Sequence, residues 1–252
     1  AQEALQKGYK KDFLLKTGLC YETDDHRLRD RFWGRVIFPV HTLSGKVVAF
    51  GGRVLDAATK GVNVKYQNSP ESAIYSKKKE LYGLFLAKQS IVKQDLCFLV
   101  EGYTDVISMH QAGFTQAVAS LGTAFTAGQA NMLRRYAREV ILAYDSDGAG
   151  VNAALRAIGI LKEVELTGKV LNLEPYKDPD EFIKHEGAEK FQQRINEAEN
   201  SFFFELRILQ RDYNLKDPES KTQFHREIAK KLCEFSEDVE RDNYIQAVAD
   251  KI

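Results

Sequence analysis

The sequence is poor in the residues that cross-link small secreted domains or build zinc sites. Its 252 residues include 3 cysteines, 5 prolines and 1 tryptophan. The cysteines (Cys20, Cys97 and Cys233) lie far apart, form no CxxC pair and have no histidine in zinc-ligand spacing. We therefore expect three reduced thiols, a reducing compartment and no histidine- or cysteine-based metal site. No apolar run approaches the ~20 residues that a membrane-spanning helix requires.

The first residues, AQEALQKGYKKDFLLK, lack the apolar stretch of a signal peptide and resemble the middle of a helix. Together with the expectation of reduced cysteines, this pattern predicts a cytoplasmic protein. It also predicts that the sequence is a piece of a longer chain.

The formal net charge is zero, but the charges are unevenly distributed. Residues 1–100 contain 17 Lys or Arg and 10 Asp or Glu, whereas residues 101–252 contain 19 and 26. A basic half joined to an acidic half suggests that one side binds a polyanion and the other binds cations. Two solvated surfaces that happen to differ in charge would give the same counts.

The first ninety residues mix short helices and strands. Helical spacing is present at 12–17, and apolar strands at 35–40 and 46–55 flank a turn at Ser44-Gly45. We expect a polar loop at 56–61, then a segment in which Pro70 stops any strand, and then helical spacing at 80–93.

After residue 95 strands and helices alternate. We expect strands at 96–102, 115–120, 139–147 and 169–175, helices at 103–114 and 149–166, and a capping box from Thr126 to Gln129. Such alternation is typical of βαβ units and a mainly parallel sheet. From Glu181 the pattern is helical, with a break at 214–218. The predicted fold class is α/β: a parallel sheet flanked by helices, preceded by a basic α+β subdomain and followed by a helical subdomain.

Acidic residues follow three of the predicted strands. The pairs are Glu101 with Asp105, Asp145 with Asp147, and Asp178 with Asp180. Because the carboxyl ends of parallel strands meet at one edge, where α/β sheets usually bind ligands, six carboxylates could converge on one crevice. Each pair also has a local explanation, as a first-turn acid, a turn or the start of a helix.

Converging carboxylates remain ionised together only beside positive charge. Their sequence neighbours are mostly Gly, Tyr, Thr, Ser and Pro, so we expect hard divalent cations rather than lysine or arginine. Mg²⁺ prefers oxygen ligands and is commonly held by one or two carboxylates plus substrate phosphates. Two such ions about 4 Å apart would hold the attacking and leaving oxygens of a phosphoryl transfer. A paired acid and base for hydrolysis is the weaker alternative, since no sugar-binding aromatic groups flank these residues.

The motifs VEGYTDV, YDSDGAG and DPDEFI resemble the glutamate, the Asp-x-Asp and the downstream acidic motif of the Toprim domain, which bacterial primases, topoisomerases and some nucleases share. The segments DRFWGRVIFPV, FGGRVL, KYQNSPES, SKKKELYGL and ASLGTAFT are similar to the polymerase core of DnaG-type replicative primases. The resemblance covers nearly the whole chain and is weakest after about residue 190. It departs from the family at Trp33, where many relatives have Arg, and at Ser146, where Gly is frequent.

This resemblance implies a core that synthesises short RNA primers on a single-stranded DNA template from ribonucleoside triphosphates, with Mg²⁺ or Mn²⁺. It implies a basic N-terminal subdomain at 1–94, a Toprim domain at 95–190 and a C-terminal helical subdomain at 191–252. The implied catalytic residues are Glu101, Asp145 and Asp147, with Glu101 either a metal ligand or the proton acceptor. The implied metal site consists of Glu101, Asp105, Asp145, Asp147, Asp178 and Asp180. Nucleotide or DNA contacts are implied for Arg31, Arg35, Arg53, Lys65, Tyr66, Asn68 and Lys77.

The chemistry of several of these basic-half residues agrees with that assignment. Arginine presents a fork of donors to phosphate, lysine acts as a point charge, and Tyr66 offers a stacking face for an unpaired base. A solvated lysine run at 77–79 and core packing of Tyr66 are the structural alternatives.

Family primases also carry a zinc-binding domain before this core and a helicase-binding domain after it. We expect both to lie outside this chain, which would meet a replicative helicase and a zinc-binding domain through the missing parts. Two other functions stay open. A Toprim nuclease or topoisomerase-like enzyme would use the same carboxylates to cleave existing nucleic acid. A non-catalytic single-strand-binding module would bind DNA equally well with and without metal.

Overall fold

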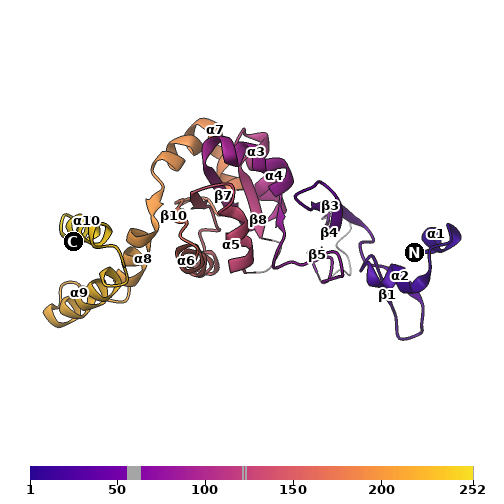
Figure 1. Ribbon diagram of the computed structural model, residues 1–252, viewed down its shortest axis with the longest axis horizontal. Helices are drawn as coiled ribbons and strands as arrows, with labels where there is room; N and C mark the ends of the chain where they lie inside the picture. The colour runs from indigo at the N-terminus through magenta and orange to yellow at the C-terminus, as the bar shows by residue number, and fades with distance from the viewer. Residues whose placement is uncertain (56–63, 121, 123, 252) are drawn as a thin grey trace. The chain divides into compact units, whose positions relative to one another are not determined.

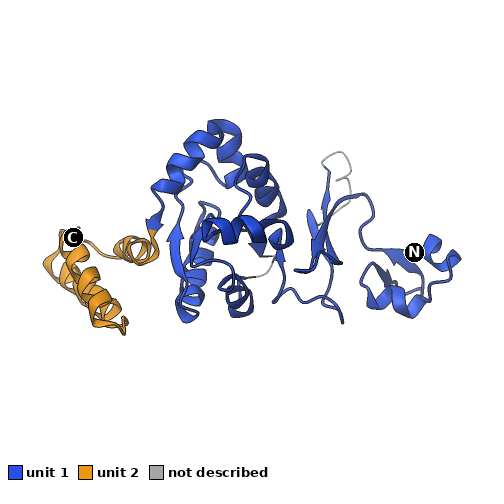
Figure 2. Cartoon of the chain, turned by 45° about the horizontal axis from the view of Figure 1, so that its top comes forward, with its two compact units in different colours: residues 1–199 blue, residues 200–252 orange. Residues whose placement is uncertain are grey.

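The computed structural model describes residues 1–55, 64–120, 122 and 124–251. The loop expected at 56–61 lies outside the described residues. Contacts within the chain define two compact units, residues 1–199 and 200–252 (Figure 2). None of the described helices is long and apolar enough to cross a membrane.

The first part of the larger unit consists of short helices and two small antiparallel sheets. Its elements are α1 (Gln2–Gln6), α2 (Lys11–Lys16), the pair β1 (Cys20–Glu22) and β2 (Leu28–Asp30), and the three-stranded sheet of β3 (Arg35–His41), β4 (Val47–Val54) and β5 (Tyr66–Asn68). The expected hairpin is confirmed, since β3 and β4 pair on either side of the turn at 42–46. Strand β5 ends two residues before Pro70, as expected, because proline cannot donate to a strand ladder.

A six-stranded sheet forms the centre of the larger unit, in the order β11-β10-β9-β7-β8-β6. Its strands are β6 (Leu81–Tyr82), β7 (Leu96–Val100), β8 (Ala117–Ser120), β9 (Glu139–Leu142), β10 (Thr167–Val170) and β11 (Glu199–Asn200). Strands β10, β9, β7 and β8 are parallel, whereas β6 is antiparallel to β8. The predicted mainly parallel sheet is therefore confirmed.

Two sequence predictions about this sheet need correction. The helix expected at 80–93 is shorter at its start, because residues 81 and 82 form β6. Helix α3 (Leu84–Gln94) begins after Gly83, whose φ of 85° is not helical. The fourth parallel strand lies at 167–170 rather than 169–175, because its ladder ends where its neighbour β9 ends, at Leu142. Leu171 and Leu173 are still buried in the core, which explains why the sequence pattern continued beyond the strand.

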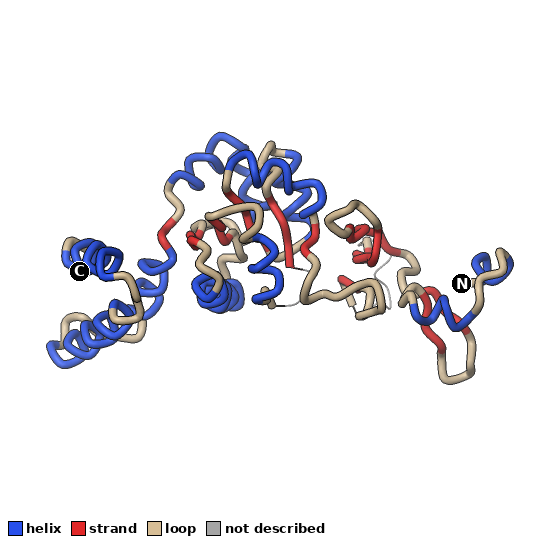
Figure 3. Tube along the Cα trace, viewed as in Figure 1, coloured by secondary structure: helices blue, strands red, loops and turns tan. Residues whose placement is uncertain are grey.

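Helices cover both faces of the sheet. Figures 1 and 3 place α4 (Tyr103–Gln111) and α7 (Pro179–Asn196) on one side, and α5 (Ala127–Leu133) and α6 (Gly148–Glu163) on the other. Phe98 of β7 packs with Phe182 and Phe191 in the core under α4 and α7. Its neighbours Cys97 and Leu99, which point to the opposite face, are also fully buried. Burial on both faces explains the continuous apolar runs in these parallel strands.

The smaller unit contains α8 (Ser201–Gln210), α9 (Pro218–Leu232) and α10 (Asp238–Ala249). Its core includes Phe202, Leu206, Phe224 and Ile228. The expected break in the helical pattern is confirmed between α8 and α9. Asp217 is the N-cap of α9, and its side chain accepts a hydrogen bond from the Ser220 amide at 2.8 Å.

Candidate functional site

Two of the predicted carboxylates meet where neighbouring parallel strands end. Glu101 directly follows β7, and Asp145 follows β9 by three residues. Because β7 and β9 are adjacent, the Asp145 amide donates a hydrogen bond of 3.1 Å to Oε1 of Glu101. A side chain at Gly150 would place its Cβ 2.0 Å from the Asp145 carbonyl oxygen, so α6 can start this close only with glycine there. The convergence of these two strand ends follows directly from the parallel sheet.

Three of the other predicted carboxylates have a role at the start of a helix. Asp105 accepts from the Gly102 amide at 3.0 Å, Asp147 from the Gly150 amide at 2.9 Å, and Asp178 from the Glu181 amide at 2.8 Å. These bonds hold the carboxylates at the amino ends of α4, α6 and α7, where the helix dipole favours negative charge. Each bond uses one oxygen of a carboxylate. The local and the metal-binding interpretations of these acids are therefore compatible.

Lysines pair with two of the predicted carboxylates, whereas the sequence led us to expect divalent cations rather than lysine or arginine as the source of positive charge. Lys177 Nζ lies 3.3 Å from Oδ2 of Asp145, and Lys184 Nζ lies 2.6 Å from Oδ2 of Asp180. Both lysines belong to the segment that contains DPDEF, and the 172–178 loop brings Lys177 back to the end of β9. The side chains of the two lysines are 62% and 68% exposed, so solvent weakens both ion pairs. Sequence reasoning missed Lys177, although it directly precedes Asp178.

Crowding of the carboxylates changes their acidity. Loss of solvent raises the pKa of Glu101 and of Asp145, and their negatively charged neighbours, which include Asp147 for both groups, add to the effect. For Asp105, which is 6% exposed, burial and then the charges of Asp178 and Asp145 raise the pKa to about 7. Burial is the largest cause of these shifts and repulsion adds to it, and a bound cation would offset both by favouring the charged form.

Asp180 behaves differently from the other acids at this edge. Desolvation acts to raise its pKa, but hydrogen bonds from Lys184 and Ser108, with the charge of Arg53, lower it overall.

Within the described residues, no three His, Cys, Asp or Glu side chains lie close enough to hold one metal ion as they stand. The edge is thus a set of neighbouring oxygen donors rather than a formed chelate.

We expect Asp105→Asn to stabilise the metal-free protein at pH 8 and to leave its stability unchanged at pH 4. The raised pKa means that the folded wild-type protein favours the protonated acid. The wild type therefore loses stability as the pH rises from about 4 through about 7, whereas the variant does not. Asparagine mimics the protonated form and can still accept from the Gly102 amide. The gain at pH 8 is on the order of 3 kcal/mol. Denaturant unfolding at several pH values measures it, and an equal effect at both pH values would contradict the buried-acid interpretation.

Three predicted nucleic-acid contacts lie beside the acidic edge. The guanidinium of Arg53 stands over the ring of Tyr66 at 5.3 Å from its centroid, and its charge is felt at Asp180. The hydroxyl of Tyr103, at the start of α4, donates to Oδ1 of Asn68 at 2.7 Å. The sheet of β3, β4 and β5 therefore joins the central sheet close to the predicted metal site.

Of the other four predicted contacts, Arg35 and Arg31 hydrogen-bond to backbone carbonyls within the basic half. Arg35 donates to the carbonyls of Val64 (2.8 Å), Lys65 (3.0 Å) and Gly52 (3.3 Å). Arg31 donates to the Gly18 carbonyl at 2.7 Å. Lys65 is exposed and Lys77 is half-buried, with the Lys77 amide bonded to Glu71 at 2.7 Å. Their contacts with nucleic acid stay a prediction.

We expect Arg35→Ala to act mainly on stability. The substitution removes three hydrogen bonds to backbone carbonyls that connect β3 to β4 and to the segment before β5. A loss of about 2 kcal/mol is expected, because bonds from a charged donor are worth more than neutral ones. Urea unfolding measures the loss, with Arg29→Ala on the exposed strand β2 as the control. Unchanged stability of Arg35→Ala with weaker DNA binding would instead assign Arg35 to the template.

Comparisons with known proteins place these features in a family. Three family descriptions match successive parts of the chain: "DNA primase catalytic core, N-terminal domain" at residues 1–88, "Toprim-like" at 98–183 and "DnaB-helicase binding domain of primase" at 203–252. A solved structure of the DnaG primase catalytic domain bound to ssDNA matches with a TM-score of 0.86 and 32% identity, over 99% of this chain and 82% of that one. The chain belongs to the DnaG primase family.

Individual members of the DnaG family extend over the same region. The DNA primase of Clostridium acetobutylicum is 42% identical over 246 residues, which are 97% of this chain and 40% of that protein. The DNA primase of Helicobacter pylori is 38% identical over 231 residues, which are 91% of this chain and 41% of that protein. The E. coli primase catalytic core matches with a TM-score of 0.84 and 32% identity, over 98% of this chain and 78% of that one. The chain thus spans about two fifths of the length of these curated relatives.

The match at 203–252 corrects one expectation from the sequence. We expected the helicase-binding part of a DnaG-type primase to lie outside this chain, yet a family with that description covers α8, α9 and α10. The sequence resemblance was weakest after residue 190, because helical packing residues such as Phe202 and Phe224 carry no chemical motif.

Proposed function

We propose that this chain is the RNA-polymerising core of a DnaG-type primase, which joins ribonucleoside triphosphates into a short RNA primer on single-stranded DNA. The proposal rests on the place where the sheet of β3, β4 and β5, called the basic sheet below, adjoins the acidic edge. Arg53 lies near enough to Asp180 to lower its pKa, and Asn68 is bonded to Tyr103, two residues after Glu101. Groups suited to a polyanion and groups suited to cations thus adjoin, as a nucleotidyl transfer requires.

Family membership implies use of a divalent metal, and we propose Mg²⁺ or Mn²⁺ at the acidic edge. The donors there fit such an ion, because they are carboxylate oxygens and the pKa values of several are raised, first by burial and then by the charges of neighbouring acids. When bound, the metal would act as a Lewis acid on the transferring phosphate. The proposed ligands are Glu101, Asp105, Asp145, Asp147, Asp178 and Asp180.

The chain's own side chains would do the remaining work. The guanidinium of the half-buried Arg53 would bind a phosphate of the template or of the triphosphate, and Tyr66 beside it would present a face to a base. The helix caps at Asp147 and Asp178 fix those carboxylates before substrate arrives, so little reorganisation is needed during the reaction. Glu101 is either a metal ligand or the acceptor of the proton from the attacking hydroxyl.

Template-directed incorporation of labelled ribonucleotides tests the proposal. Purified chain, single-stranded DNA and the four ribonucleoside triphosphates should give short RNA complementary to the template with Mg²⁺ or Mn²⁺, and none with chelator. A labelled strand that is cut without incorporation would favour the nuclease alternative. DNA binding that is independent of metal, with neither product, would favour a binding module.

Four further assignments accompany this proposal. We propose that residues 1–94 hold the template, that 95–190 carry the acidic edge and that 191–252 form the helical part. We propose that α8, α9 and α10 contribute to binding the replicative helicase, on the strength of the family match there. We also propose a zinc-binding domain as a partner and the bacterial cytoplasm as the location.

A further inference from the structure

Residues 76–80 form a turn between β5 and β6, called the lysine turn below, that carries three consecutive lysines. Its backbone closes on itself, because the Ser76 carbonyl accepts from the amides of Lys79 at 3.0 Å and Glu80 at 3.1 Å. The ammonium groups of the three lysines form no ion pair with any residue that the structure describes. Three neighbouring charges of one sign repel each other, so a bound anion would stabilise them.

A buried glutamine of α5 holds this turn in place. The side chain of Gln129 is 0% exposed, and its amide nitrogen donates to the carbonyls of Lys77 at 3.0 Å and Glu80 at 2.8 Å. Its Oε1 accepts from the Thr126 amide at 3.1 Å. Reversing the side-chain amide would set its oxygen against two carbonyl oxygens, so these three contacts fix its orientation.

The other member of the capping box contacts the same turn. Thr126 Oγ1 donates to the Lys78 carbonyl at 2.7 Å and accepts from the Gln129 amide at 3.2 Å. A Cβ at Gly128 would lie 3.1 Å from the Lys78 carbonyl oxygen, so the first turn of α5 fits closely against the lysine turn. A capping box needs only its own helix end, yet here both side chains also bind carbonyls 48 to 52 residues earlier in the chain.

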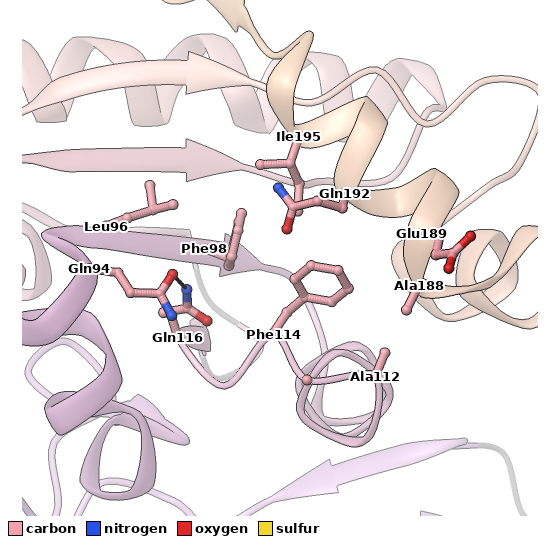
Figure 4. A pocket seen from close by; sticks show the side chains of 11 residues that line it. Gln94, Leu96, Phe98, Ala112, Phe114, Gln116, Ala188, Glu189, Gln192 and Ile195 are labelled. Atoms are coloured by element: carbon pink, nitrogen blue, oxygen red, sulfur yellow. Dashed lines mark hydrogen bonds between the residues drawn. The ribbon is translucent and has the colours of Figure 1, made fainter.

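A second buried glutamine shows that such complete pairing is not automatic. Gln116 bonds to the side chain of Gln94 beside the pocket drawn in Figure 4, and its Oε1 has no partner among the described residues. Gln129, in contrast, uses its oxygen and both hydrogens of its amide group. Its long-range bonds therefore specify one position of the lysine turn relative to α5.

The residues that hold the lysine turn also reach the proposed site. A Cβ at Gly122, four residues before Thr126, would lie 2.7 Å from Nδ2 of Asn68. Asn68 in turn accepts a hydrogen bond from Tyr103, which starts α4 beside the acidic edge. The lysine turn therefore adjoins the region proposed to hold nucleic acid.

We propose that Gln129 is a positioning residue, which holds the lysine turn in the shape in which Lys77, Lys78 and Lys79 bind phosphate groups. The inference rests on the proposed function, because the phosphates are those of the DNA template or of the triphosphates. Lysine acts on phosphate as a point charge, and a turn that is ordered beforehand loses less entropy on binding. Gln129 is buried, so it acts only through the turn.

Fluorescence anisotropy with labelled single-stranded DNA, measured without metal, tests the proposal through a double-mutant cycle. Gln129→Met keeps the length of the side chain and removes its three hydrogen bonds. It should weaken binding about fivefold at low salt, because the turn must then be ordered during binding. Alanine at positions 77, 78 and 79 together should weaken binding further and make the slope of log affinity against log salt shallower by about 2. In that lysine-free background Gln129→Met should have no further effect on affinity.

The source of the phosphates is identified by the same variants in template-directed synthesis. We expect the template, because three adjacent charges suit successive phosphates of a strand, and the DNA affinity then falls as stated. A raised KM for ribonucleoside triphosphates with unchanged DNA affinity would assign the lysine turn to the triphosphate. Wild-type DNA affinity and wild-type KM in a folded Gln129→Met protein would overturn the proposal.

Two further variants separate positioning from stability. Ile158→Ala truncates a buried side chain of α6 and should lower the melting temperature without changing DNA affinity. Thr126→Val removes the bond to the Lys78 carbonyl and should weaken binding about twofold, which provides the measurement if Gln129→Met does not melt cooperatively. A loss of the same size with and without the three lysines, in either variant, would overturn the proposal. Because DNA binding is measured without catalysis, a chain that makes no primers would refute the proposed function and leave this test valid.

Discussion

Asp145→Asn should reduce primer synthesis by about a thousandfold or more, as expected when electrostatic stabilisation of a phosphoryl transfer is removed. Asp145 follows the end of β9, where its amide donates to Glu101 and its carboxylate pairs with Lys177. The fold should survive, because asparagine has the same shape and because removing one of several repelling charges relieves strain on the metal-free protein. Labelled-nucleotide incorporation measures the loss, and a cooperative melt with a normal circular dichroism spectrum establishes folding.

The same variant should lose stabilisation by metal and nucleoside triphosphate together. In the wild type this stabilisation follows the binding constant by mass action, so the melting temperature rises with ligand concentration. Asp242→Asn, an equivalent change at an exposed position of α10, serves as the control and should leave both measurements unaltered. A folded Asp145→Asn protein that makes primers at nearly the wild-type rate would refute the proposed site.

Arg53→Ala should weaken single-stranded DNA binding by about tenfold at low salt, the value of one charge-assisted contact. Arg53 lies on β4 with its guanidinium over Tyr66, at the place where the basic sheet meets the acidic edge. If it neutralises one phosphate, the slope of log affinity against log salt should become shallower by about 0.7. Fluorescence anisotropy with labelled oligonucleotides at several salt concentrations measures both quantities.

A matched substitution separates this effect from a general loss of positive charge. Arg135→Ala removes an exposed arginine just before β9, at the other end of the strands, and should change neither affinity nor slope. Equal losses in the two variants would mean that the overall charge attracts DNA without a defined channel. An unchanged slope in Arg53→Ala would remove Arg53 from the proposed phosphate contacts.

Much of the fold could be predicted because the central strands are buried on both faces. Full burial makes a strand such as Leu96–Val100 continuously apolar, and the turns and caps that follow it are local in sequence. The capping box at Thr126 is an example, since its two hydrogen bonds to and from Gln129 span three residues. Strand ends were less predictable. The end of β10 coincides with the end of its partner β9. Strand β6 is only two residues long and forms by pairing with β8, which lies far from it in sequence.

The sequence by itself determined which residues carry the acidic motifs and that they follow strands of a mainly parallel sheet, because apolar runs and the turns after them are local patterns. Only the tertiary structure decided how the charges at that edge are balanced. Lys177 reaches Asp145 through the loop after β10, and Arg53 reaches the neighbourhood of Asp180 from a separate sheet. The structure also committed Arg35 to backbone carbonyls and Gln129 to the carbonyls of the lysine turn. Such contacts join residues far apart in sequence, and no local pattern encodes the distance between them.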